Sequence, residues 1–287
     1  MEPWACPPWP VWRSIARSAA AAFVIEASSP KISGVTATES LKDLTLEAFV
    51  QSSYYIYDTL IELPSYRDCV PLGEPLLKLM RSVLEDPSVG TNTCLGYGMT
   101  IIPMASSLLY SLRAGSYANP ETGVLAGYGK LVRCLREEPP ELLLKSIEAA
   151  GPSYHGKYYT SRKLKSVYDV LAESAPWDLV ARNIVGGFRA TLDVYRCVRS
   201  KLTSGMRDAV SRCYRLAAGE LLDSISFKSG GLMTSRFVQV LASSGMDDGS
   251  VREVLVGRLG VNLGSVSDIV ASAVALVMIE DSMRVLA

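Results

Sequence analysis

The chain has 287 residues and equal numbers of basic and acidic side chains, 29 of each. Because no net charge draws the molecule toward a polyanion, we expect neither nucleic acid nor a membrane as its partner, and any anion site should be local. Hydrophobic residues make up 48% of the chain, enough for a substantial core. We expect a single domain over residues 1–287, with residues 1–14 as a loose N-terminal extension.

Histidine and cysteine usage excludes several classes of site. His155 is the only histidine, so an imidazole-based zinc site is nearly excluded, and a Ser-His-Asp triad would depend on this residue. The six cysteines lie far apart and form no C-x-x-C pair, so reduced, mostly buried thiols are expected, in a cytoplasmic protein. These cysteines are Cys6, Cys69, Cys94, Cys134, Cys197 and Cys213.

Two apolar runs resemble targeting or membrane segments without fitting either. The run from Ala19 to Ile25 is short and flanked by Arg17 and Glu26, so it fits neither a signal peptide nor a span. The run from Val266 to Ile279 contains Asp268 and falls short of the ~18 apolar residues of a membrane helix. A buried helix explains it better.

In chain order, helical periodicity recurs and the alternation typical of strands does not. A first helix ends at Pro64, and its apolar face is predicted to contain Leu41, Leu44, Phe49, Ile56, Leu60 and Leu63. A second begins near Pro75 and ends at Asp86-Pro87, and a third begins at Pro139-Pro140 with Gly151 as its C-terminal cap. The residues from 113 to 129 and from 151 to 160 are rich in Gly, Tyr and Ser, and we expect loops there.

Trp177-Asp178 opens a further helix, which is predicted to continue through Gly186-Gly187 toward Val198. Later helices are expected at residues 206–222, 236–242, 251–259 and 265–286. The whole pattern predicts an all-α, multi-helix bundle of roughly ten helices.

Four stretches place polar residues at predicted helix ends, where unsatisfied backbone groups make binding sites easy to build. They are residues 26–31 (EASSPK), 90–96 (GTNTCLG), 223–231 (DSISFKSGG) and 262–268 (NLGSVSD). A weaker element is Asp178-Leu179-Val180-Ala181-Arg182 with Gly187-Phe188.

In this order the stretches resemble the signatures of the triphosphoribosyl-dephospho-coenzyme A synthase family, over about residues 20–280. The resemblance implies an all-helical enzyme that transfers the triphosphoribosyl group of ATP onto dephospho-coenzyme A or a similar acceptor and releases adenine. Its partners would be the small-molecule substrates ATP and dephospho-coenzyme A, and we expect Mg²⁺ as cofactor. The resemblance also places Asn262 among the substrate-binding residues.

Two departures from the family signatures support an alternative. The chain reads Pro30-Lys31-Ile32-Ser33-Gly34-Val35 where the family has P-K-P-G-x-V, and Cys94-Leu95 follow Thr93 where active bacterial members carry His and Lys. The alternative is a noncatalytic helical protein that keeps the scaffold and nucleotide binding.

Displacing adenine from ATP requires protonation of the leaving base and neutralisation of the triphosphate. Glu26 and Asp268 are the candidates for acid-base chemistry, and both are candidate Mg²⁺ ligands because that ion prefers hard oxygen donors. Asp178 and Asp223 are further candidate metal ligands. The ordinary alternative for Glu26 is a capping carboxylate, whereas an unpaired Asp268 within an apolar helix would be costly.

The remaining candidates bind substrate. Thr91, Asn92 and Thr93 lie where a turn leads into a helix, which favours phosphate, although such residues are also standard N-caps. Lys31 and Lys228 are candidate triphosphate ligands, and solvated turns are their alternative. The basic and aromatic segment from Gly151 to Lys165, with Tyr154 and His155, could stack adenine or face water. Residues 123–130 lack the glycine spacing of a phosphate loop.

Overall fold

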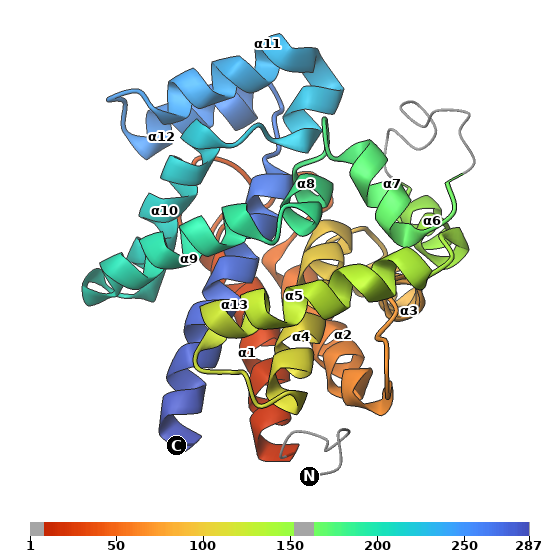
Figure 1. Ribbon diagram of the computed structural model, residues 1–287. Coiled ribbons are helices and arrows are strands. Elements are labelled where there is room, and N and C mark those ends of the chain that lie inside the picture. The colour runs from red at the N-terminus through yellow and green to blue at the C-terminus, as the bar shows by residue number, and fades with distance from the viewer. Residues whose placement is uncertain (1–8, 152–163, 287) are drawn as a thin grey trace.

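The computed structural model describes residues 9–151 and 164–286, and its regular structure is helical. The all-α prediction is confirmed, with thirteen α-helices in this part of the chain where about ten were expected (Figure 1). They are α1 (Trp9–Ser28), α2 (Leu46–Glu62), α3 (Gly73–Glu85), α4 (Leu95–Arg113), α5 (Pro120–Glu137), α6 (Glu141–Ala149), α7 (Val167–Ser174), α8 (Leu179–Val185), α9 (Arg189–Lys201), α10 (Met206–Glu220), α11 (Ser224–Ala242), α12 (Asp248–Arg252) and α13 (Gly264–Leu286). Short 3-10 turns follow α2 (Leu63–Ser65) and α9 (Leu202–Ser204), and a π-helical segment follows α12 (Glu253–Arg258).

Helices α1 and α13 form the centre of the fold. They pack lengthwise and antiparallel, with the start of α1 and the end of α13 at the bottom of Figure 1. Helix α13 is buried along most of its length from Val266 to Ile279, as expected from its apolar sequence. The sequence assigned residues 9–14 to a loose extension, but they form the first turns of α1, where Trp12 is fully buried and donates to the Leu60 carbonyl at 2.9 Å.

Several predicted helix boundaries are confirmed and one is displaced. Helix α3 ends at Asp86, and Gly151 follows α6 with a φ of +58°, the left-handed conformation of a C-terminal cap. Helix α2 begins after the Thr45 N-cap, which accepts from the Ala48 N–H at 3.2 Å. Leu41 and Leu44, expected on this helix, precede it and pair with each other as an isolated bridge.

The predicted loop from Arg113 to Gly129 is wrong, because most of it belongs to α5. Asn119 and Thr122 form a capping box at the start of this helix. A side chain at Gly127 would overlap the backbone of Ser107 on α4. Gly127 therefore serves the close packing of α5 on α4 rather than a flexible turn.

The predicted helix through Gly186-Gly187 is also wrong. Helix α8 ends at Val185, and Gly187 and Phe188 have φ angles of +73° and +61°, which break the helical path. The single proton of the Tyr128 hydroxyl is shared between the carbonyl oxygens of Ile184 and Val185, at 3.0 and 2.6 Å. The glycine pair separates α8 from α9.

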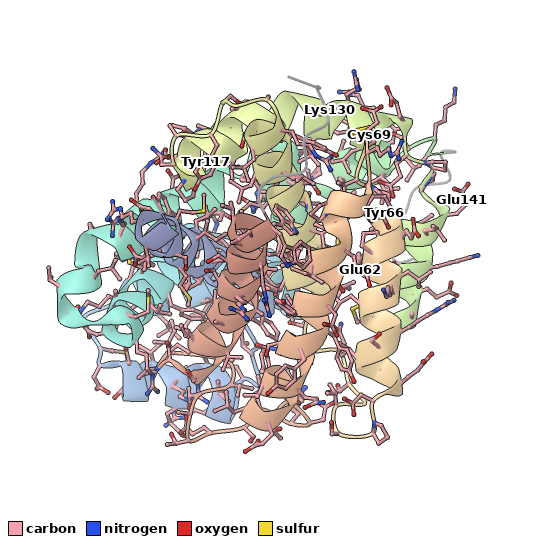
Figure 2. All side chains as sticks on the ribbon, turned by 90° about the horizontal axis from the view of Figure 1, so that it is seen from below. Glu62, Tyr66, Cys69, Tyr117, Lys130 and Glu141 are labelled. Atoms are coloured by element: carbon pink, nitrogen blue, oxygen red, sulfur yellow. A yellow bond between two sulfur atoms is a disulfide. The ribbon has the colours of Figure 1, made fainter. Side chains whose placement is uncertain are left out.

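The expectation of reduced thiols is wrong for four of the cysteines. Cys69 is bonded to Cys134, which joins the segment before α3 to α5, and Cys197 is bonded to Cys213, which joins α9 to α10. Cys69 and Lys130 lie near each other in Figure 2, where this segment meets α5. Among the described residues Cys94 is the free cysteine, and it is buried.

Within residues 9–151 and 164–286, one helix has the length and hydropathy of a membrane span. This helix is α4, and 78% of its most apolar window is buried inside the fold. Such burial is typical of the core helix of a soluble protein.

Candidate active site

A cavity of about 540 Å³ lies where the C-terminal end of α1 meets the N-terminal ends of α4, α11 and α13. We call it the central cavity. Its volume falls within the range of roughly 300–1,000 Å³ typical of ligand pockets. Backbone N–H groups at helix N-termini carry partial positive charge, so this convergence favours an anionic ligand.

The central cavity brings together all but one of the candidate residues from the sequence. Those that line it are Glu26, Lys31, Thr91, Asn92, Thr93, Asp178, Lys228, Asn262 and Asp268. Asp223 does not line it. Residues more than 200 positions apart thus share one wall, because antiparallel packing places the end of α1 beside the start of α13.

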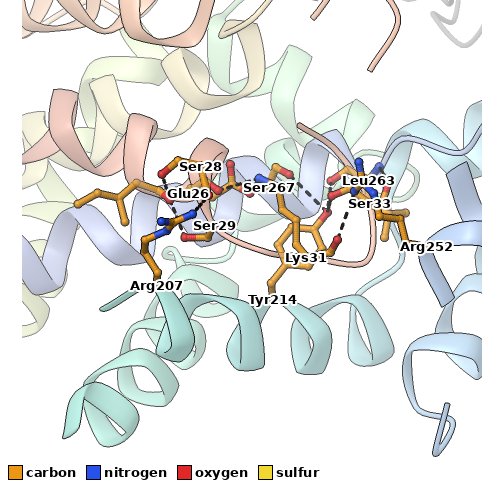
Figure 3. A network of polar contacts seen from close by, with 11 residues as sticks. Glu26, Ser28, Ser29, Lys31, Ser33, Arg207, Tyr214, Arg252, Leu263 and Ser267 are labelled. Carbon is orange, nitrogen blue, oxygen red and sulfur yellow. Dashed lines mark hydrogen bonds and ion pairs between the residues drawn. The ribbon is translucent and has the colours of Figure 1, made fainter. Parts of the chain in front are cut away.

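Glu26 and Lys31 form a buried ion pair at the end of α1 (Figure 3). Both side chains are 2% exposed, and the Lys31 ammonium donates to Glu26 Oε1 at 2.7 Å and to the Glu26 carbonyl at 2.8 Å. Burial lowers the pKa of Lys31, and the Glu26 charge opposes this shift. The pairing removes the cost of an isolated buried charge on either partner.

The loop that carries Lys31 is anchored to the segment before α13. Ser33 Oγ donates to the Val261 carbonyl at 2.9 Å and accepts from the Leu263 N–H at 3.3 Å, and Ile32 is fully buried (Figure 3). Lys31 also lies over the Tyr214 ring, 5.6 Å from its centroid. The residues that depart from the family signature therefore hold Lys31 against the central cavity.

Asp268 lies in the second turn of α13, deep in the molecule, with its remaining accessible surface facing the central cavity. Its carboxylate touches the first turn of α4, where a Cβ on Gly96 would overlap Oδ2, and it accepts from the Tyr97 N–H. Burial, and next the charge of Glu26, raise the pKa of Asp268 well above its ordinary value. A carboxyl group of this kind keeps its proton more readily than an ordinary carboxyl group and can act as a proton donor.

The segment before α4 is shaped by its own hydroxyl groups. Asn92 Oδ1 accepts from the Leu95 N–H at 3.1 Å, Thr91 donates to Asp43 at 2.6 Å, and Thr93 shares a hydrogen bond of 2.6 Å with Ser52. Of the capping roles that the sequence left open, only that of Asn92 is matched, because Thr91 and Thr93 bond to side chains of other segments. These bonds also hold the Asn92 side chain at the cavity wall.

Cys94 follows Thr93 at the position where active bacterial members of the family are expected to have histidine. It is buried, and burial raises the pKa of its thiol to about 12. Cys94 is therefore neutral at physiological pH and suits neither nucleophilic nor acid-base chemistry there.

Lys228 and Asp178 form the opposite wall. The Lys228 ammonium donates to Asp178 Oδ2 at 2.8 Å, and Asp178 Oδ1 caps α8 by accepting from the Ala181 N–H at 3.0 Å. The two side chains are 19% and 21% exposed, so the pair remains accessible from the cavity.

Asp223 is buried behind this wall and joins α11 to α13. Its carboxylate accepts from the Ser226 N–H at 2.8 Å, from Ser265 Oγ at 2.5 Å and from the Val266 N–H at 3.1 Å. Both oxygens thus have protein donors, and burial raises the pKa of this carboxyl group. The structure places Asp223 as a link between two helix starts.

Among the described residues, no three His, Cys, Asp or Glu side chains are grouped closely enough to enclose a metal ion. This arrangement differs from an all-protein metal cage. It is compatible with Mg²⁺, which proteins usually bind through one or two carboxylates together with substrate phosphates.

Several residues of the central cavity were not singled out from the sequence. Phe23 and Phe49 line one side, with ring centroids 4.9 Å apart, and Ser224, Ser265 and Ser267 contribute hydroxyl groups. The serines lie inside the motifs at residues 223–231 and 262–268, so the sequence could have identified them as candidate site residues. The aromatic pair could not be identified in this way, because aromatic residues on helical faces most often belong to the core.

The basic segment from Gly151 to Lys165 lies mostly outside the described residues, and Tyr154 and His155 are among those outside. Gly151 itself lines the central cavity.

Comparisons with known proteins agree on one family. A sequence profile described as CitG, ATP:dephospho-CoA triphosphoribosyl transferase, matches residues 12–285. A crystal structure from Archaeoglobus fulgidus, assigned as a triphosphoribosyl-dephospho-CoA synthase, has the same fold, with a TM-score of 0.61 and 18% identity over 80% of this chain and 98% of that one. No protein of curated function matches significantly. Because the profile spans nearly the whole chain, this protein belongs to the ATP:dephospho-CoA triphosphoribosyl transferase family, a family of enzymes that transfer a triphosphoribosyl group.

Proposed function

We propose that the central cavity transfers the triphosphoribosyl group of ATP onto a hydroxyl group of dephospho-coenzyme A and releases adenine. The observation that carries this proposal is the convergence of residues from separate signatures, including Glu26, Asn92, Lys228 and Asp268, on one cavity. Membership of the family supplies the reaction class.

The reaction breaks the bond between the ribose anomeric carbon and adenine. Adenine leaves with the electron pair of that bond and takes up a proton, while the acceptor oxygen forms the new bond and loses its proton. Asp268 is suited to donate to adenine because its raised pKa favours the protonated form. We assign proton removal from the acceptor to Glu26, whose Oε1 lies 2.7 Å from the Lys31 ammonium.

Triphosphate binding needs positive charge beyond that of the protein. Lys31 and Lys228 line the cavity together with Glu26, Asp178 and Asp268, so the side chains alone do not balance a polyanion. A Mg²⁺ ion held by Asp178 together with the phosphate oxygens of ATP would supply the missing charge and neutralise the triphosphate. Lys31 and Lys228 contribute charge-assisted hydrogen bonds to the phosphates.

The amide side chains of Asn92 and Asn262 provide neutral hydrogen-bonding groups in the same cavity. We assign them to orienting the base and ribose of ATP. Thr91 and Thr93 act mainly through Asn92, because their hydroxyl groups already bond to Asp43 and Ser52. The cytoplasmic location stays a prediction: ATP and dephospho-coenzyme A are intracellular metabolites, whereas disulfides are typical of oxidising compartments.

Incubation with ATP, Mg²⁺ and dephospho-coenzyme A tests the proposal. Free adenine should appear together with a product whose mass equals that of the acceptor plus the triphosphoribosyl group. Adenine release should stop when either the acceptor or Mg²⁺ is omitted.

The noncatalytic alternative predicts that ATP binds without any release of adenine. That result would overturn the proposed transfer while keeping nucleotide binding. Release of ADP or phosphate in place of adenine would indicate phosphoryl transfer and would also overturn it.

A further inference from the structure

A second hollow of about 430 Å³ lies on the surface of α11, and we call it the apolar groove. It is lined by Met233, Phe237, Leu259 and Val261, with hydroxyl groups from Ser229 and Thr234. Met233 is 82% exposed, Phe237 45% and Leu259 49%, which is unusual for large apolar side chains gathered at one place. Such exposed apolar clusters commonly mark binding sites.

The apolar groove adjoins the central cavity along two separate segments. On α11, Lys228 lines the cavity and Ser229, the next residue, lines the groove. Before α13, Val261 lines the groove and Asn262, the next residue, lines the cavity. Consecutive Cα atoms are 3.8 Å apart, so the groove and the cavity are adjacent both on α11 and in the segment before α13.

A break in α11 sets the orientation of the groove. Gly231 has φ +74° and ψ −172°, a conformation essentially restricted to glycine, and it interrupts the helix between Lys228 and Met233. The turn before the break faces the central cavity, and the turn after it presents apolar side chains to the groove. One helix thus serves two hollows of opposite character.

The two hollows differ in charge. The cavity contains the ion pairs of Lys31 with Glu26 and of Lys228 with Asp178, whereas none of the side chains described as lining the groove is charged. The groove therefore suits a neutral, partly apolar segment of a ligand whose charged part occupies the cavity.

We propose that the apolar groove binds the pantetheine arm of the acceptor, an inference that rests on the proposed function. Dephospho-coenzyme A has a charged nucleotide end with ribose hydroxyl groups, and a flexible arm that is uncharged and contains two amides. With the nucleotide end in the central cavity, the arm leaves past Ser229 and lies on Met233 and Phe237. The hydroxyl groups of Ser229 and Thr234 offer partners for its amides.

The test compares two acceptors that share the nucleotide end, dephospho-coenzyme A and ADP, which lacks the arm. The double variant Met233→Ser and Phe237→Ser removes apolar surface from exposed positions, so the fold should be retained. Val240→Ser is the matched control, because Val240 is 66% exposed on the same helix and does not line the groove.

We expect the double variant to raise the KM for dephospho-coenzyme A about tenfold, without change in the KM for ATP or in kcat/KM with ADP. Isothermal titration without ATP should show the same weakening for dephospho-coenzyme A and none for ADP. Val240→Ser should behave as the wild type in both measurements.

Three results would overturn the inference. Unchanged binding of dephospho-coenzyme A to the double variant, with normal turnover by the wild type, removes the groove from the site and leaves the transferase proposal intact. Failure of the wild type to release adenine with any acceptor overturns both. A dimer in sedimentation that dissociates in the double variant assigns the groove to contact between two copies of this chain.

Discussion

At the scale of single residues, Asp268 is the group on which the proposed chemistry depends most. It is a carboxylic acid held deep in the fold beside Glu26, and its pKa is raised first by burial and then by that neighbouring charge. Active sites commonly contain such perturbed groups because a proton donor must keep its proton at the working pH. Burial of this carboxyl group lowers the free energy of unfolding.

Asp268→Asn should abolish adenine release and increase stability. The folded state of the wild type keeps a proton that the unfolded state loses above about pH 4, so the contribution of Asp268 to stability is full below that pH and is lost as pH rises. In metal-free protein at pH 7.5 the variant should melt about 2–4 °C higher, which corresponds to about 1 kcal/mol. Adenine release should fall at least ~100-fold.

Thermal melts from pH 4 to pH 8 in a chelator measure this effect, and the difference between the two proteins should shrink toward pH 4. Asp58→Asn, at an exposed position on α2, is the control and should change neither property. A variant that is less stable than the wild type at pH 7.5, or that still releases adenine at the normal rate, would contradict the assignment.

At the scale of elements, the site is built from helix ends that approach one another closely. The first turn of α4 contacts the carboxylate of Asp268 on α13, and this contact is sterically open only to glycine at position 96. The Asp223 carboxylate similarly joins the starts of α11 and α13 through Ser226, Ser265 and Val266. Small shifts between these helices would therefore displace catalytic groups.

Gly96→Ala should lower the rate of adenine release at least tenfold while α4 remains helical. The added Cβ overlaps Asp268 Oδ2, so the carboxylate must rotate away from the Tyr97 N–H. Gly129→Ala, on the exposed side of α5 with no atom within 4 Å of the new Cβ, is the matched control and should slightly increase stability. Steady-state kinetics and circular dichroism of both variants measure these effects; full activity in Gly96→Ala would contradict the contact.

The same elements show what sequence periodicity could predict. Helix ends at Pro64, Asp86 and Gly151 were predicted correctly because proline and glycine act locally. Whether other glycines lie inside a helix or end it depended on tertiary contacts. Gly127 lies inside α5, where it packs against Ser107, whereas Gly187 lies just after the end of α8. The candidate residues could be found because their motifs occur in a recognisable order along the chain. That Asp223 does not reach the cavity could not be predicted, because both of its carboxylate oxygens bond to groups of α11 and α13 that only the fold brings together.

At the scale of the whole molecule, the antiparallel packing of α1 and α13 brings the C-terminal end of α1 beside the N-terminal end of α13 at the site. The disulfides lie away from the central cavity and restrain the surrounding helices. Their pairing could not be predicted, because Cys69 and Cys134 are 65 residues apart and become neighbours only through the packing of α5.

Reduction of the disulfides should lower the free energy of unfolding. In a loop-entropy model the bond between residues 16 positions apart contributes about 3 kcal/mol, and the bond between residues 65 positions apart about 4 kcal/mol. The double replacement Cys69→Ser and Cys134→Ser should therefore destabilise more than Cys197→Ser and Cys213→Ser. Denaturant unfolding with and without reductant measures this order, and an unchanged midpoint after reduction would show that the bonds do not form.

A crystal structure of the protein with ATP and Mg²⁺ would test the central claim most directly. We predict the triphosphate within hydrogen-bonding distance of Lys31 and Lys228, and adenine within reach of Asp268. A nucleotide bound outside the cavity between α1, α4, α11 and α13 would contradict the account.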